Sequence, residues 1–246
     1  SSVLDSEALG ALLTMTIQVL TKQALKNLIL LLGAVIMGFP FLWMIANSLM
    51  GLKQIYRFPP DFIPDPVIWS NYTEALEQLQ LRVFYNSFVF TIGVTVGIVM
   101  LSLLSAYVFA RLRMPGKNLI FLLYVSSLLI PWQVTIVPQF VIVAKLGWVN
   151  TYQGLIIPYL AQLSVGAFFF RQFFMRFPRD LYDAATIDGC SVPGIFARIY
   201  LPLGKPAIAA FGSVTALSAW NQYVWPLIVT QSKDMYTLTV ALGILA

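Results

Sequence analysis

Five long stretches without a charged side chain constrain this sequence more than any other feature. They cover residues 27–52, 83–110, 118–144, 146–170 and 206–232. A helix of about 20 mostly apolar residues crosses the roughly 30 Å hydrocarbon core of a bilayer. The runs do not show the two-residue alternation typical of strands in membrane barrels. The sequence therefore predicts an all-α polytopic membrane helix bundle with five visible spans.

The composition agrees with a membrane protein. Of the 246 residues, 59% are hydrophobic and 10% are charged, whereas soluble domains carry about 25% charged residues. A soluble domain of this size cannot bury so much apolar surface, because a large part of its exterior must still face water. We therefore exclude a soluble enzyme and expect one bundle.

Several kinds of chemistry are also excluded. The chain has no histidine and one cysteine, Cys190, which removes histidine-based triads, most zinc sites and an internal disulfide framework. It contains no G-x-x-x-x-G-K-[ST] phosphate-binding loop. None of the five predicted spans carries an ionisable Asp, Glu, Lys or Arg within the membrane, which argues against a proton- or sodium-driven carrier. We attribute the net charge of +5 to basic loops rather than to nucleic-acid binding.

Charge asymmetry between the loops predicts orientation. Cytoplasmic loops of membrane proteins carry an excess of Lys and Arg. We therefore place the N-terminus and the segment 171–205 inside. Ten basic residues then lie on the inner side, against five on the outer side, which are Lys53, Arg57, Arg82, Lys145 and Lys233. The inner ten are Lys22, Lys26, Arg111, Arg113, Lys117, Arg171, Arg176, Arg179, Arg198 and Lys205.

Two segments outside the spans have separate interpretations. Residues 1–27 are expected to form a cytoplasmic or interfacial segment before a transmembrane domain at 28–246. Residues 8–20 are apolar but too short to span. They can lie on the membrane as an amphipathic helix, extend the first span, or be a remnant of another sequence. On the outer side, residues 71–80 are expected to form a short surface helix.

The inner segment 171–205 has more internal order than a connector needs. Asp180 and Asp183 follow Pro178, and acidic residues favour the first turn of a helix. Gly189 can end that helix in the left-handed conformation. A second helix can begin after residues 191–194, with an apolar stripe at helical spacing. Its members are Ile195, Phe196, Ile199 and Leu203, and Pro202 and Pro206 are expected to bracket the return into the membrane. This predicts an elbow that another protein can approach.

The residues of this elbow resemble a known motif. Asp-Ala-Ala-Thr-Ile-Asp-Gly at 183–189, followed by Ile-Tyr-Leu-Pro at 199–202, resembles the EAA loop of bacterial binding-protein-dependent ABC importer permeases, with Asp183 in place of the usual Glu. Residues 85–87, 105–111 and 220–226 are similar to the carbohydrate-uptake permeases, of which the maltose-type second permease subunit is an example. The resemblance extends from about Leu28 to the end.

The resemblance implies a type I importer permease fold with six spans, so a sixth helix is expected after residues 237–246. It implies that this chain binds no cofactor and that ATP and Mg²⁺ are bound by a separate ATPase dimer. Further implied partners are a second homologous permease, an extracytoplasmic substrate-binding protein that meets residues 56–65, and membrane lipid. The residues implied to couple to the ATPase are Asp183, Ala184, Ala185, Asp188 and Gly189, with Leu201 and Pro202 setting the turn back into the bilayer.

A sugar pathway requires aromatic faces and amide or hydroxyl groups. Candidates are Trp220, Asn221, Tyr223 and Trp225 in the last span, and Trp132 and Gln133, with the nearby Gln139, in the third. The tryptophans can instead belong to an interfacial belt. We interpret the chain as a permease for a sugar or oligosaccharide in the bacterial inner membrane. One alternative is a permease for glycerol phosphates, although no intramembrane Arg or Lys marks an anion site. Another is a standalone carrier or channel, but such a protein has no partner that would require a cytoplasmic elbow.

Overall fold

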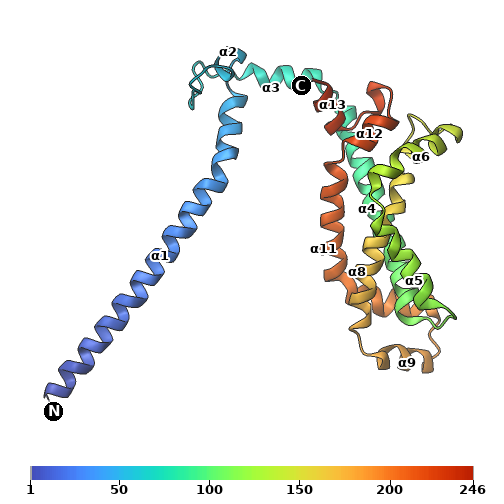
Figure 1. Cartoon of the computed structure of the whole chain (residues 1–246), viewed down its shortest axis with the longest axis horizontal. Coiled ribbons are helices and arrows are strands. Elements are labelled where there is room, and N and C mark those ends of the chain that lie inside the picture. The colour runs from blue at the N-terminus through green and yellow to red at the C-terminus, as the bar shows by residue number, and fades with distance from the viewer. Residues whose placement is uncertain (1, 246) are drawn as a thin grey trace. The chain divides into compact units, whose positions relative to one another are not determined.

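The computed structural model describes the backbone of residues 2–245 and the side chains of residues 20–245. Every regular element in this described part is a helix (Figure 1), which confirms the predicted all-α class. The chain divides into two compact units, Ser1–Gln78 and Leu79–Ala246. The boundary between the units lies after Gln78, between the first and second charge-free stretches. Each unit is described separately below.

The first unit consists of α1 (Ser2–Ser48), α2 (Leu52–Ile55) and α3 (Ser70–Gln78). The part of α1 from Leu20 to Ser48 is 29 residues long, and after Lys26 it exposes mainly apolar side chains around the helix. Such a helix is typical of a membrane span. The backbone of the segment 2–27 is continuous with this helix, while the side chains before Leu20 lie outside the described residues.

The polar segment after α1 is tied to the end of that helix. The Asn71 side chain donates hydrogen bonds to the carbonyls of Ser48 and Met50 at 3.0 and 2.9 Å. Trp43 packs edge-on against Phe62, with ring centroids 5.0 Å apart. The hydrogen bonds of Asn71 hold α3 in place, and α3 (Ser70–Gln78) confirms the short surface helix expected at residues 71–80.

Three helices form the centre of the second unit: α4 (Leu81–Arg111), α8 (Ser164–Met175) and α11 (Leu201–Trp220). Figure 1 shows α8 and α11 beside α4, and both make extensive contact with it. Small residues allow the close approach, as is common between membrane helices. A Cβ atom on Gly97 would meet the side chain of Leu160, and one on Gly166 would collide with Ser102.

The third charge-free stretch is not one straight crossing. It forms α5 (Lys117–Ser126), the 3₁₀ turn η1 (Ser127–Leu129) and α6 (Trp132–Lys145), with a 97° bend between the two halves. Pro131 explains the break, because proline supplies no N–H and disfavours helical geometry at the preceding residue. Ile130 accordingly has an extended backbone, with φ −88° and ψ 113°.

The fourth and fifth stretches are also interrupted. The fourth contains α7 (Tyr152–Ile156), η2 (Pro158–Leu163) and α8, which together form an apolar helical segment of 24 residues. The fifth contains α11, which breaks at residues 221–223 before α12 (Val224–Val229). The 20 residues of α11 correspond to about 30 Å of helix. Among the described residues, three helices have the length and composition of a span, or four with the bent pair.

The end of the second unit that holds α12 is fastened to the start of α4. Asn86 is fully buried, and its Nδ2 donates to the carbonyls of Asp234 and Tyr236 at 2.8 and 2.9 Å. Its Oδ1 accepts a 2.6 Å bond from the Tyr152 hydroxyl. These bonds position η4 (Lys233–Met235), which leads into α13 (Leu238–Leu245).

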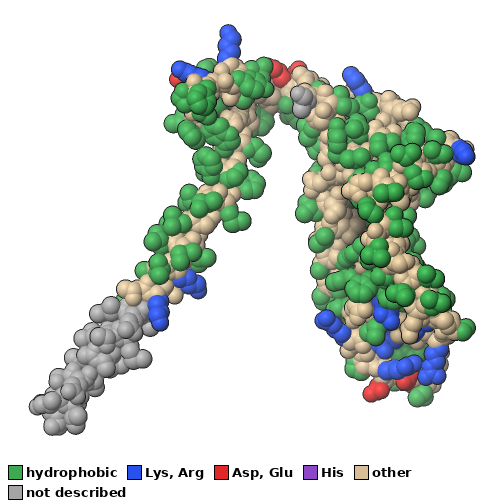
Figure 2. All heavy atoms as spheres, in the orientation of Figure 1, with side chains coloured by type: hydrophobic (Ala, Val, Ile, Leu, Met, Phe, Trp, Pro, Cys, Tyr) green, Lys and Arg blue, Asp and Glu red, His purple; other side chains and the backbone are tan. Residues whose placement is uncertain are grey.

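The opposite end of the second unit is basic. Figure 2 shows Lys and Arg side chains gathered at the end where α9 (Arg179–Ile187) lies in Figure 1. Arg111, Arg171 and Arg179 lie within electrostatic reach of Lys117 there. Within the second unit, these basic residues of the predicted inner loops therefore lie at one end.

Candidate functional site

The first helix of the elbow is α9, and it ends as the sequence predicts. The Cys190 N–H donates to the Ala185 carbonyl at 2.9 Å, and the Gly189 N–H donates to the Thr186 carbonyl at 3.1 Å. This pair of bonds is the Schellman ending of a helix, which requires a left-handed residue. Gly189 supplies it with φ +77°. The glycine therefore fixes the exit direction of the chain from α9.

The implied coupling residues divide into an outward and an inward group. Asp183, Ala184, Asp188 and Gly189 are exposed, whereas Ala185 is buried in the core of the second unit. Ile187 is 86% exposed between these residues. The outward surface of α9 thus combines two carboxylates, one small residue and one large apolar side chain. Such a surface suits insertion into a cleft of another protein.

An aromatic cluster attaches the elbow to the bundle. Tyr200 is fully buried, and its ring lies 5.0 Å from that of Tyr107 and 5.2 Å from that of Phe174. The Tyr107 hydroxyl donates to the Val192 carbonyl at 3.0 Å. Burial raises the pKa of the Tyr200 phenol, with an opposing effect from the Arg111 guanidinium. The cluster therefore joins the second helix of the elbow to α4 and α8.

The predicted apolar stripe is right for its first members and wrong for its last. Ile195 and Phe196 are buried, but Leu203 is 46% exposed. Tyr200 and Gly204 take the inward positions instead. The reason is a π-helical turn, η3 (Phe196–Tyr200), which follows α10 (Val192–Ile195). A π turn inserts an extra residue and shifts the inward face of the following helix.

The prediction that Leu201 and Pro202 set a turn back into the bilayer is wrong. The backbone is helical from Val192 to Trp220, and both residues lie in the first turn of α11. A proline ring collides with the carbonyl four residues earlier in a regular α-helix. The wider π turn immediately before Pro202 relieves that collision, so the chain enters the bundle without turning.

Arg111, the last residue of α4, joins the elbow to the bundle, a contact that was not predicted from the sequence. Its Nη2 donates to the carbonyls of Phe174 and Phe177 at 2.6 and 2.7 Å. Its guanidinium lies over the Tyr200 ring, 5.3 Å from the centroid. Arg111 thereby caps α8 just before Pro178 and α9, and it ties both to the end of α4. Its place at the end of the family-like stretch 105–111 was the available signal.

The four pathway candidates of the last span are not equivalent. Trp225 is 2% exposed, and its indole N–H donates to the Leu155 carbonyl at 3.0 Å. In the described structure it is a core residue and does not face a cavity, contrary to the expectation. Asn221 is exposed and donates back to the Leu217 carbonyl at the end of α11. Trp220 packs edge-on against Phe88, and Tyr223 is 36% exposed.

The two candidates of the third stretch are separated by the fold. Trp132 lines a cavity of about 410 Å³ together with Gln139, while Gln133 is exposed and is not part of its lining. Consecutive residues of a helix point about 100° apart, which follows from 3.6 residues per turn. The pairing of Trp132 with Gln139 was therefore available from spacing, because seven residues complete two turns.

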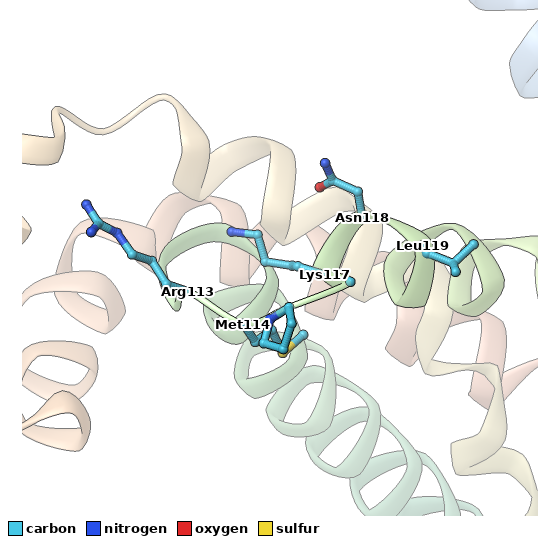
Figure 3. Close-up of a pocket in the computed structure, with 7 residues that line it drawn as sticks. Arg113, Met114, Lys117, Asn118 and Leu119 are labelled. Atoms are coloured by element: carbon cyan, nitrogen blue, oxygen red, sulfur yellow. The ribbon is translucent and has the colours of Figure 1, made fainter.

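A second cavity, of about 580 Å³, lies at the basic end in the loop between α4 and α5. Figure 3 shows Arg113, Lys117 and Asn118 around it. The Lys117 Nζ donates to the Leu112 carbonyl at 3.1 Å. Cations near the C-terminus of a helix stabilise its unpaired carbonyls, so Lys117 secures the end of α4.

Comparisons with known proteins agree with the geometry. Residues 93–244 match the family described as "Binding-protein-dependent transport system inner membrane component". The sn-glycerol-3-phosphate transport system permease protein UgpE of Brucella suis biovar 1 (strain 1330) is 35% identical over 225 residues, covering 88% of this chain and 79% of the relative. The arabinooligosaccharides transport system permease protein AraQ of Bacillus subtilis (strain 168) is 35% identical over 209 residues, covering 83% of this chain and 74% of the relative.

Solved structures share this fold, and one of them illustrates it. It is the crystal structure of a bacterial ABC transporter involved in the import of the acidic polysaccharide alginate. The TM-score is 0.78 with 21% sequence identity, and the match covers 89% of this chain and 78% of the other. The arrangement of helices described above is thus a known membrane fold.

Proposed function

Because this chain belongs to the family of binding-protein-dependent transport system inner membrane components, we propose that it is driven through α9 by a cytoplasmic ATPase. The family consists of permease subunits of ABC importers in the inner membrane, which transport a substrate and are not catalytic enzymes. ATP and Mg²⁺ are then bound by the partner ATPase, and this chain supplies half of the pathway.

The observation that carries this proposal is the outward surface of α9. Its exposed Ile187 and Ala184 are flanked by carboxylates, at the basic end of the second unit. The elbow is fastened to α4, α8 and α11 by Arg111 and the aromatic cluster around Tyr200. A movement of α9 is therefore passed to the bundle as a rigid-body displacement. Binding of α9 to one state of the ATPase shifts the bundle between two conformations.

The other partners follow from the same role. They are a second homologous permease, an ATPase dimer, an extracytoplasmic binding protein that meets residues 56–65, and lipid around the apolar helices. The exposed apolar surface of α1 between Leu20 and Ser48 supports contact with lipid or with the second permease. The ten basic residues of the inner loops support an N-terminus in the cytoplasm.

The substrate is proposed to be a sugar or oligosaccharide. Relatives are named for sn-glycerol 3-phosphate and for arabinooligosaccharides, so a glycerol phosphate is the alternative. A standalone carrier is a weaker candidate, because the rigid attachment of α9 serves no purpose without a partner.

The test of the proposed function is affinity purification of the detergent-solubilised protein through a tag on this chain, followed by mass spectrometry. We expect a nucleotide-binding ATPase and a second permease to co-purify in stoichiometric amounts. A chain that purifies stably without an ATPase would contradict the proposal and favour a standalone carrier.

A further inference from the structure

The cavity beside Trp132 lies where two helical segments are interrupted. One wall comes from η1 and α6, on both sides of the 97° bend at Pro131. The other wall comes from η2 and the start of α8, where Gln162 departs from helical geometry with φ −79° and ψ 16°. The Ser127 and Ser164 hydroxyls, 2.8 Å apart, join the two walls.

The cavity lies at the depth of the membrane interior. The Leu163 carbonyl accepts a 2.9 Å hydrogen bond from Ser102, and the Leu160 side chain contacts Gly97. Gly97 is at the midpoint of the charge-free part of α4, residues 83–110. Ser102 is nine residues from Arg111, which is about 13 Å along the helix. The wall at residues 161–165 is therefore well inside the hydrocarbon region.

The lining is mostly apolar, with a small set of uncharged polar groups. Trp132, Thr135, Gln139, Gln162 and Ser164 face the cavity, and no charged side chain lines it among the described residues. In the described part of the chain, neither the Gln139 amide nor the Trp132 indole N–H makes a hydrogen bond. Free amide and indole donors in hydrocarbon carry a free-energy cost, so polar groups at this depth face a pathway rather than lipid.

This set of groups suits one class of ligand. A neutral sugar offers hydroxyls to amides and an apolar ring face to an indole. A phosphate or carboxylate at this depth requires a cationic partner, and none lines the cavity. The volume of about 410 Å³ falls within the range of about 300–1,000 Å³ for small-molecule sites.

We propose that the cavity between the broken helices η1–α6 and η2–α8 is a transport subsite for a neutral carbohydrate, with Trp132 stacking on the sugar ring and Gln139 binding its hydroxyls. The proposal rests on the function proposed above and deepens it. It assigns contact with the substrate to this chain, and it separates neutral sugars from anionic substrates.

The experiment uses the complete importer with its binding protein in proteoliposomes. The probes are radiolabelled arabinotriose and maltotriose, which are neutral, and sn-glycerol 3-phosphate, which is anionic. We expect ATP-dependent uptake of a neutral probe only. Gln139→Leu, which keeps the volume but removes the amide, is expected to lower that uptake about tenfold at subsaturating concentration. Assembly with the ATPase and basal ATP hydrolysis are expected to stay within twofold of the original protein.

Gln153→Leu is the matched control, because Gln153 is an exposed amide on α7 outside the cavity lining. It is expected to transport within twofold of the original protein. Uptake confined to the anionic probe, or absence of neutral uptake, would overturn the subsite. So would equal uptake by Gln139→Leu. Loss of complex assembly in Gln139→Leu would reassign the cavity to the interface with the second permease. Failure of the original complex to hydrolyse ATP would count instead against the proposed function.

Discussion

Gly189→Val is expected to lower ATP-driven uptake by at least tenfold while the protein remains folded in the membrane. Gly189 has φ +77°, and a β-branched residue in the left-handed region costs on the order of 1–3 kcal/mol. No neighbouring atom lies within 4 Å of an added Cβ, so the effect comes from the backbone rather than from a collision. The strain opens the bonds to Thr186 and Ala185 that end α9. Uptake and binding-protein-stimulated ATP hydrolysis in proteoliposomes measure the result.

Gly189→Asn is the control for this variant. Asparagine tolerates the left-handed conformation better than other non-glycine residues, so it should retain at least half of the original uptake. Both variants add a side chain of similar size at the same exposed position, so the comparison chiefly reports backbone geometry. Unchanged uptake and stimulated ATP hydrolysis in Gly189→Val would show that the end of α9 does not matter for coupling.

Arg111→Met is expected to raise the number of ATP molecules hydrolysed per substrate molecule transported, by fivefold or more. Methionine retains much of the apolar stem but removes both hydrogen bonds to the carbonyls of Phe174 and Phe177. Hydrogen bonds from a charged group contribute about 1.5–3 kcal/mol each. Without them the segment that leads from α8 into α9 loses its hydrogen bonds to the end of α4, so movement of α9 is passed to the bundle less effectively. Parallel assays of ATP hydrolysis and uptake give the ratio.

Arg113→Met provides the matched control, because it removes the same charge two residues away. Arg113 is exposed and makes no hydrogen bond in the described structure, so the ratio should stay within twofold. Arg111→Lys retains one donor and should recover part of the coupling. A purely structural role for Arg111 predicts lower complex yield with an unchanged ratio in the surviving complexes, and that outcome would refute its positioning role.

The sequence was sufficient for features that depend on local chemistry. The end of α9 follows from the need for a left-handed residue, and only Gly189 at the right distance from Pro178 meets it. The span at α4 follows from length and the absence of charge. The surface helix α3 follows from its short polar sequence between turn residues.

Other features depend on geometry that composition does not record. The length of the charge-free stretch 118–144 does not indicate how its two helices are oriented, although Pro131 marks the position of the 97° bend between them. The π turn at residues 196–200 changes the number of residues per helical turn. A prediction that assumes regular α-helical spacing therefore places Leu203 on the inward face and misses Tyr200. Trp225 and Trp132 are the same residue type, yet packing buries one and places the other in a cavity. The partners of Arg111 are 63 and 66 residues away, beyond the range of any local pattern.

The most direct test of the central claim is photocrosslinking from α9. A photoreactive phenylalanine derivative replaces Ile187, which is 86% exposed, and separately Val214, which is 65% exposed on α11. Membranes that contain the complete importer are then irradiated with and without ATP. The account predicts a crosslink from position 187 to the nucleotide-binding subunit, and none from position 214. Absence of that crosslink from position 187, or equal crosslinking from both positions, would contradict the docking of α9 on the ATPase.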